Sequence, residues 1–439
     1  MRRSRDPFDL HIIYVYWHAA DEAVESGWRR VTRIALTPPL RNYIAARVLE
    51  MTSKWIFRVT TPMVVWQLTH DERMLAASLA CLLLPGLVTE LVGGIVADSY
   101  DRRTIMISSC LGSVVCNLAI AAISLAGALS IELLLGLTVV YGGINSVSNA
   151  STKTIITAFV RKEDLATAVS LNTVVFNVAG FIGPAVAAGL IYTMGNAAAY
   201  IASAMLSLGF VALLTRIRTP DNDNSGHHGS FLAALRDGFF HVIAVRLLLL
   251  VFVFHIASIG LTRPFLEFVP AIVHHSFAGG PREAGFLFSA FGFGSICGGL
   301  WLASSQTRTT RLAAIALGAM PIFAGALLGL ALSPSLPLAV VFAFAAGFGM
   351  ITRGGAIQSM MQLESHPAYR GRVMALHGVM FEIGAMAGAL FIGEMARAVN
   401  LTVALSACVG MLLLLWVSIR KPLSRAALLR QNSVPPPGT

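Results

Sequence analysis

Residues 168–185 read "AVSLNTVVFNVAGFIGPA" and residues 373–390 read "VMALHGVMFEIGAMAGAL". At an offset of 205 residues these stretches place identical residues on each other: Leu171 on Leu376, Phe176 on Phe381 and Gly183 on Gly388. The same offset aligns further identical residues along the chain: Gly93 and Gly94 with Gly298 and Gly299, Arg103 with Arg308, Gly142 with Gly347, and Arg58 with Arg263. A single offset over this length indicates that the chain contains two copies of one structural unit.

The composition assigns these two units to a membrane. The chain has 439 residues, of which 56% are hydrophobic and only 12% are charged, whereas soluble proteins carry about 25% charged residues. Twelve segments are apolar and long enough to cross a bilayer: 41–68, 74–97, 104–127, 131–158, 165–192, 196–216, 243–273, 282–304, 311–333, 336–362, 371–395 and 400–419. We therefore expect an all-α membrane protein with twelve transmembrane helices in two six-helix halves related by a pseudo-repeat.

The domain boundaries follow from these segments. Residues 217–242 are rich in Asp, Asn, Gly and His, which is typical of a linker between the halves. The predicted organisation is an N-terminal segment (1–40), a first half (41–216), the linker (217–242), a second half (243–420) and a tail (421–439). The N-terminal segment is either an amphipathic helix on the membrane surface or a disordered leader.

The basic residues predict the orientation. Of the 32 Lys and Arg residues, six lie inside predicted spans, and only Arg73, Arg282 and Arg397 fall in the loops opposite the N-terminus. Lys and Arg concentrate in cytoplasmic segments of membrane proteins, so both termini are expected in the cytoplasm. This distribution also accounts for the net charge of +10 without a nucleic-acid partner.

A charged loop follows the second span, in "VGGIVADSYDRR" (92–103). The chain has two halves of six predicted spans and a long linker between them. Together with these features, the loop resembles the signature of the major facilitator superfamily, roughly G-x-x-x-D-R/K-x-G-R-R. The sequence departs from that signature at Ser99 and Asp101. The "ADSYDRR" variant and "FNVAGFIGPAVAAGL" in span five are similar to the bacterial branch that contains the enterobactin exporter and drug effluxers.

This resemblance implies a mechanism and roles for several residues. Two halves would rock around a site near the middle of the bilayer, and spans 1, 4, 7 and 10 would line it. The second half has Ala303 where Asp98 stands, so we expect a charge latch only at the first-half loop. We call five of its residues the gating loop: Gly94, Asp98, Asp101, Arg102 and Arg103. Three residues in span five are expected to pack helices closely: Gly180, Gly183 and Pro184.

Basic residues inside the membrane are costly and therefore predict function. Five of them lie on the four spans that the resemblance assigns to the cavity: Lys54, Arg58, Lys153, Arg263 and Arg353. Together with Glu50 and Glu267 they predict a cavity with a net positive charge, which attracts an anion. Arg58 and Arg263 occupy equivalent positions and are expected to face each other. Lys153 could instead extend to the cytoplasmic interface.

The acids inside the spans are candidates for proton coupling. Glu382 is our first choice, because it replaces Asn177 of the first half, and Glu90 is the second. Glu50 and Glu267 stand four residues from Lys54 and Arg263, a spacing that also suits structural ion pairs. The histidines His255 and His377 are expected to be satisfied polar groups rather than relays. No sequence motif predicts an enzyme, a cofactor or a metal site.

We therefore predict a monomeric secondary active transporter in the bacterial inner membrane. It would export a small organic anion, such as a siderophore-like metabolite or a drug, by proton antiport. Its partners would be this substrate, protons and the lipid bilayer. Two alternatives stay open: uptake of an organic anion by proton symport, and a receptor on the same fold that transports nothing.

Overall fold

The computed structural model describes residues 38–99, 101–155, 165–216, 231–305 and 309–432. These residues form helices and contain no β-strand. The first half has six helices: α2 (Pro38–Thr69), α3 (Glu72–Ser99), α4 (Arg102–Leu125), α5 (Ile131–Ile155), α6 (Leu165–Met194) and α7 (Asn196–Leu214).

The second half begins with a short helix and a broken one. These elements are α8 (Phe231–Ala244), α9 (Arg246–Thr262), the 3-10 helix η3 (Arg263–Leu266) and α10 (Val269–Phe277). Five long helices follow: α11 (Pro281–Ala303), α12 (Thr309–Leu332), α13 (Leu336–Glu364), α14 (Arg370–Ala398) and α15 (Leu401–Asn432).

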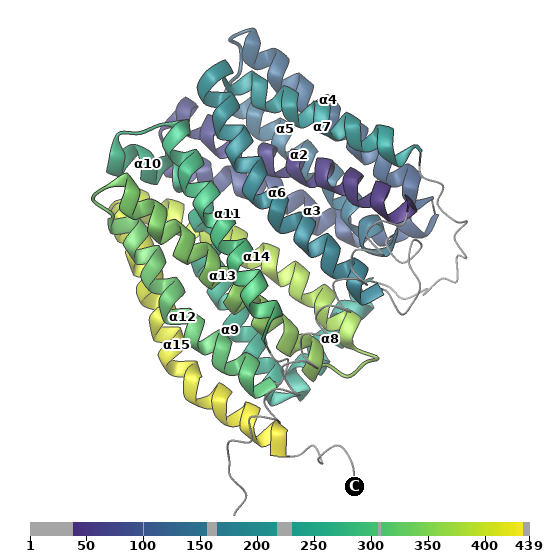
Figure 1. Cartoon of the computed structure of the whole chain (residues 1–439), viewed down its shortest axis with the longest axis vertical. Helices are drawn as coiled ribbons and strands as arrows, with labels where there is room; N and C mark the ends of the chain where they lie inside the picture. The colour runs from purple at the N-terminus through teal and green to yellow at the C-terminus, as the bar shows by residue number, and fades with distance from the viewer. Residues whose placement is uncertain (1–37, 100, 156–164, 217–230, 306–308, 433–439) are drawn as a thin grey trace, which may run out of the picture.

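The two halves form two bundles that lie side by side (Figure 1). The purple to teal helices of the first half pack against one another, and the green and yellow helices of the second half do the same. The halves meet mainly where α6 contacts α11 and where α3 contacts α14. The prediction of an all-helical protein in two six-helix halves is confirmed.

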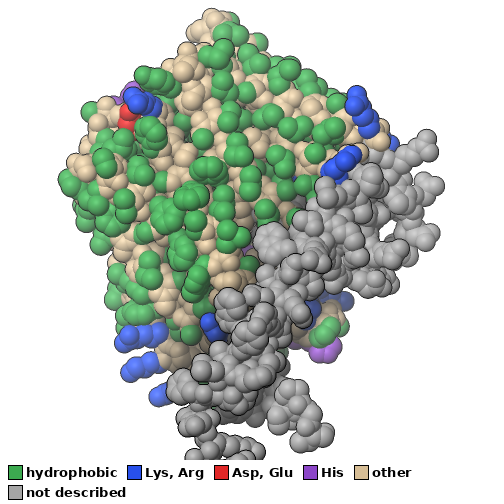
Figure 2. Space-filling view, in the orientation of Figure 1, with side chains coloured by type: hydrophobic (Ala, Val, Ile, Leu, Met, Phe, Trp, Pro, Cys, Tyr) green, Lys and Arg blue, Asp and Glu red, His purple; other side chains and the backbone are tan. Residues whose placement is uncertain are grey.

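The surface is that of a membrane protein. Eleven helices of the described residues are long and apolar enough to cross a membrane. Hydrophobic side chains cover the middle of the face in Figure 2, and basic side chains lie near its margins. Helix α2 corresponds to the first predicted span and has 32 residues. It is less apolar than the eleven because Arg47, Lys54 and Arg58 interrupt its sequence.

The repeat is visible in how the helices cross. A Cβ added at Gly142 of α5 would lie 2.2 Å from the Leu82 carbonyl oxygen of α3. In the second half, a Cβ at Gly347 of α13 would lie 1.9 Å from the Phe291 carbonyl oxygen of α11. The aligned glycines therefore serve the same purpose, since each allows two backbones to approach more closely than any side chain permits.

Three segments differ from the expected ranges. The seventh span (243–273) is not one helix, because Pro264 and Pro270 lack the N–H groups that a continuous helix needs. The last part of the linker forms α8, and part of the tail extends α15 to Asn432. Arg263 is the first residue of this 3-10 segment, and it lies near Glu267, which also contacts Arg58 of the first half.

Candidate functional site

A cavity of about 420 Å³ lies between the two halves. Helices α2 and α6 of the first half form one wall, and α9, η3, α11, α13 and α14 of the second half form the other. Its basic side chains are Arg58, Arg263 and Arg353, three of the five that the sequence places at a substrate site.

Glu267 lies between two of these arginines. Its Oε1 atom is 3.8 Å from Arg58 Nε and 3.6 Å from Arg263 Nη1. Glu267 and Arg263 are buried, whereas the Arg58 side chain is 28% exposed. Both distances exceed that of a hydrogen bond, so the contacts are charge–charge contacts. Arg58 of the first half and Arg263 of the second half therefore lie next to one shared carboxylate at the cavity.

Arg353 forms no ion pair with a carboxylate in the described part of the chain. It is 2% exposed, and its guanidinium carbon lies 5.2 Å from the centre of the Phe323 ring. Within the described residues, Arg353 Nε and Nη1 have no hydrogen-bond partner. Buried polar groups are nearly always paired, and a buried unpaired charge is costly. Of the three cavity arginines, Arg353 is thus the one whose charge is not already balanced by a described carboxylate.

Two histidines complete this part of the cavity. The rings of His255 on α9 and His377 on α14 stack with centroids 5.0 Å apart and an angle of 14° between their planes. Both line the cavity with Arg353. Within the described residues, His255 Nδ1 has no hydrogen-bond partner. The sequence shows both residues inside spans but has no signal that they meet, because they come from helices far apart in the chain.

A cluster of aromatic and polar side chains joins the halves near the turn between α2 and α3. We call Trp66, His70, Glu72, His274 and His275 the Trp66 cluster. The Trp66 ring lies 5.6 Å from His274 and 5.4 Å from His275, between ring centroids. His275 Nε2 lies 3.0 Å from Glu72 Oε1. Because His274 and His275 belong to α10, these contacts connect the two halves at this end.

Comparison with known proteins identifies the architecture. Residues 39–437 match a family of the major facilitator type that is described as "Transmembrane secretion effector". The chain belongs to this family. It is a multi-pass membrane transporter and not an enzyme.

Solved structures agree with this assignment. A bacterial homologue of the human lysosomal transporter Spinster, in its inward-facing and unoccupied conformation, matches with a TM-score of 0.70 and 14% identity. That match covers 91% of this chain and 98% of the other. The nucleoside transporter NupG matches with a TM-score of 0.69 and 13% identity, covering 87% of this chain and 99% of that one. The human organic anion transporter MFSD10 (TETRAN) has a TM-score of 0.58 and 16% identity, covering 89% and 99%. These identities support a shared fold alone. No curated protein matches the transporter by sequence.

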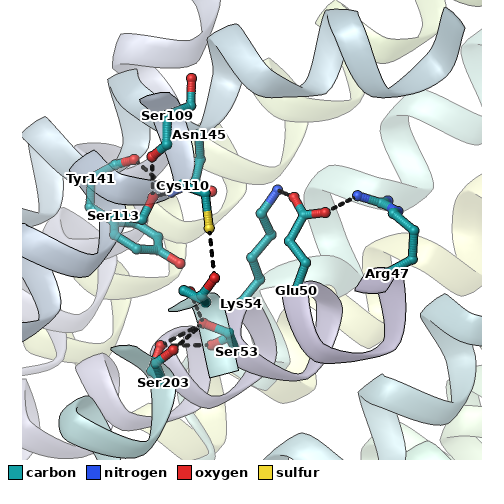
Figure 3. Close-up of polar contacts among 11 residues, drawn as sticks. Arg47, Glu50, Ser53, Lys54, Ser109, Cys110, Ser113, Tyr141, Asn145 and Ser203 are labelled. Atoms are coloured by element: carbon teal, nitrogen blue, oxygen red, sulfur yellow. Dashed lines mark hydrogen bonds and ion pairs between the residues drawn. The ribbon is translucent and has the colours of Figure 1, made fainter. Parts of the chain in front are cut away.

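Lys54 and Glu50 lie away from the cavity. Lys54 Nζ is 2.7 Å from Glu50 Oε1, and Arg47 binds the other oxygen of this carboxylate (Figure 3). Lys54 lines a small polar pocket inside the first half, beside Ser113 and Asn145. Glu50 is thus paired with two cations, Arg47 and Lys54. Lys54 and Glu50 do not line the cavity and so add nothing to its charge.

Glu382 lies at the contact between the halves. A Cβ added at Gly86 of α3 would be 3.4 Å from Glu382 Oε2, so this carboxylate points toward α3. The neighbouring Phe381 lines the cavity, but Glu382 is not among its lining residues. Three other predicted residues have side chains outside the described part: Glu90, Asp98 and Lys153.

Two gating-loop residues stabilise helix ends. Asp101 is the N-cap of α4, where its Oδ2 atom accepts hydrogen bonds from Thr104 N at 2.9 Å and from Thr104 Oγ1 at 3.0 Å. Arg103 donates from Nε to the Leu214 carbonyl at 3.2 Å and from Nη2 to the Thr215 carbonyl at 2.6 Å. These contacts tie the start of α4 to the end of α7. The surroundings of Gly94 and the side chain of Arg102 lie outside the described part.

The span-five glycines pack α6 against α2. A Cβ at Gly183 would lie 2.6 Å from Trp55 Cβ, and one at Gly180 would lie 3.2 Å from the Trp55 ring. Gly180 and Pro184 also line the cavity. Because Gly180 and Gly183 have no side chains, Trp55 fits between α2 and α6 at the wall of the cavity.

Proposed function

We propose that the transporter exports a small organic anion by proton antiport. The observation that carries this proposal is the Arg353 guanidinium at a cavity between the halves, whose Nε and Nη1 have no hydrogen-bond partner within the described residues. Among the described residues, Arg58, Arg263 and Arg353 provide three positive charges, and Glu267 provides one negative charge. The remaining two positive charges stand in a low-dielectric cleft, where they attract an anion and repel a cation.

Glu267 is the coupling acid in this proposal. Of the four candidate acids, it is the one whose described carboxylate contacts cavity arginines on both halves. A proton on Glu267 removes its negative charge, so the attraction between Arg58 of the first half and the second half is lost. One proton taken up at Glu267 thereby frees the halves to move and leaves Arg58 and Arg263 positive.

The transporter is proposed to work by alternating access, with the Trp66 cluster as the closed gate of this state. The distribution of basic residues in the sequence supports an assignment of this end to the side opposite the cytoplasm. The Spinster homologue, whose fold is similar, was solved in an inward-facing conformation. Together these observations favour an inward-facing state, with both termini cytoplasmic in a bacterial inner membrane.

Reconstituted vesicles test the charge of the substrate, the direction and the coupling. Vesicles loaded with radiolabelled organic anions or cations of matched size are placed in buffer that is more acidic than their interior. Antiport predicts that the acid outside speeds anion efflux, whereas symport predicts that it slows anion efflux. Movement of cations alone would contradict the proposed substrate.

Three variants assign the roles in the same assay. Arg353→Gln should abolish anion efflux with or without a pH gradient. Glu267→Gln should keep anion exchange at equal pH but lose the acceleration by acid. Arg282→Gln is the matched control, because Arg282 is an exposed basic residue that lies over the Tyr192 and Phe286 rings and not at the cavity. Full acid-driven efflux by Glu267→Gln would remove Glu267 from the coupling role.

A further inference from the structure

We propose that the cavity is a two-part site for an aromatic carboxylate with one or two rings. This inference rests on the proposed function, that the cavity binds a transported anion. It assigns the carboxylate to Arg353 of the second half and the ring to the aromatic wall formed by Trp55 and Phe176 of the first half.

The head-group part of the site follows from how the charges are divided. Arg58 and Arg263 already share Glu267 in this state, and Arg353 has free Nε and Nη1 donors among the described residues. The guanidinium group of Arg353 lies over the ring of Phe323 from α12, which limits how that group can turn. A fixed planar guanidinium group suits a carboxylate, because it can donate two parallel hydrogen bonds.

The stacked histidines stand next to this anchor. His255 Cε1 lies 4.0 Å from the position of a Cβ added at Gly354, the residue after Arg353. His255 Nδ1 has no hydrogen-bond partner within the described residues. Because His255 and Arg353 line the same cavity, His255 Nδ1 in its protonated tautomer can donate a further hydrogen bond to a carboxylate bound there.

The opposite wall of the cavity is aromatic. The Trp55 and Phe176 ring centroids are 5.6 Å apart with an angle of 59° between the rings. Phe176 lines the cavity and is 46% exposed, so a large part of its ring is available to a ligand. Trp55 packs closely against Gly180 and Gly183 of α6. Tilted rings at this distance leave an aromatic surface against which a third ring can stack.

The size of the cavity limits the ligand. A volume of about 420 Å³ lies near the lower end of the roughly 300–1,000 Å³ typical of small-molecule pockets. It suits a compact acid with one or two rings, and it is small for a macrocyclic siderophore with several catechol groups. The inference therefore narrows the substrate class from organic anions to small aromatic acids.

Binding to the purified full-length transporter tests this assignment with three matched probes. These are 2-naphthoate, the saturated acid trans-decalin-2-carboxylate, and the neutral alcohol 2-naphthalenemethanol. Titration calorimetry in detergent should show that 2-naphthoate binds at least tenfold more tightly than either of the other two. Equal affinity for the saturated acid would overturn the aromatic assignment and leave the anion proposal standing. Failure of both acids to bind would overturn both.

Variants locate the two parts of the site. Arg353→Gln should weaken 2-naphthoate at least tenfold and leave the alcohol unchanged. Trp55→Leu should weaken 2-naphthoate by about three- to tenfold and leave the saturated acid unchanged. Arg282→Gln should change neither affinity. The thermal unfolding midpoint without ligand is measured for each variant, so that a loss of binding in a folded protein is distinguished from misfolding. Normal 2-naphthoate affinity in folded Arg353→Gln would refute the assignment of the anchor.

Discussion

Gly292 on α11 allows a close contact between the two halves. A Cβ added there would lie 2.7 Å from Phe181 Cα and 2.8 Å from the Gly180 carbonyl oxygen, both in the backbone of α6. Because these are backbone atoms, no rotation of a side chain can relieve the overlap. We therefore predict that Gly292→Ala forces α6 and α11 apart beside the cavity.

The size of the effect follows from the distances. Non-bonded carbon atoms prefer separations of about 3.5–4.0 Å, so the helices must separate by roughly 0.8 Å or more at this crossing. Overpacking of this kind costs about 1–3 kcal/mol. A change of that size in one conformational state shifts the equilibrium between states by about 5–150-fold. Gly292→Ala should therefore weaken the packed arrangement of the halves.

Gly299→Ala is the matched control on the same helix. Its added Cβ would lie 3.6 Å from Ile351 Cγ2 and 3.9 Å from Asn177 Nδ2, which are ordinary contacts. Both variants gain the same helix propensity from alanine, about 1 kcal/mol, so this term cancels between them. Unfolding midpoints in detergent and efflux rates in vesicles are compared. We expect a lower midpoint and altered transport for Gly292→Ala alone, and equal behaviour of the two variants would refute the reasoning.

Three further changes test other parts of the structure. Trp66→Ala should open the end of the cleft at the Trp66 cluster. In a background without the native cysteines, a cysteine placed at the buried Met63 should then react faster with a membrane-impermeant maleimide. An unchanged rate would mean that Trp66 does not close this end. Asp101→Ala removes the N-cap of α4 and should cost about 1 kcal/mol of stability, whereas Asp101→Asn should retain most of it; equal unfolding midpoints for the two would argue against capping. Glu50→Gln leaves Arg47 and Lys54 without their shared carboxylate and should cost about 3–5 kcal/mol. Adding Lys54→Met should restore part of the monodisperse yield on size-exclusion chromatography, and no recovery would contradict a role of charge imbalance.

Much of the fold could be predicted because its signals are local. A run of about 20 apolar residues predicts a membrane helix wherever it occurs, and an offset repeat predicts two similar halves. The aligned glycines Gly142 and Gly347 do lie at equivalent helix crossings. The break in the seventh span has a local cause too, but Pro264 and Pro270 alone do not say whether a membrane helix bends, breaks or stays straight.

The candidate site was harder to predict, as α2 shows. Glu50, Lys54 and Arg58 follow one another at intervals of four residues, which suggests one helix face. Each interval nevertheless turns the helix by about 40° beyond a full turn, so Glu50 and Arg58 point roughly 80° apart. In the folded transporter Glu50 and Lys54 form a pair inside the first half, and Arg58 reaches the cavity.

The sequence by itself determined the membrane environment, the helical class, the two halves and which spans contain charged residues. These properties depend on composition and on short-range spacing, which are present before the chain folds. Only the tertiary structure decided that Glu267 stands between Arg58 and Arg263, that His255 stacks on His377, and that Arg353 lacks a described carboxylate partner. Each of these facts depends on how helices distant in the sequence rotate and pack against one another, and the pattern within a single helix does not contain that information.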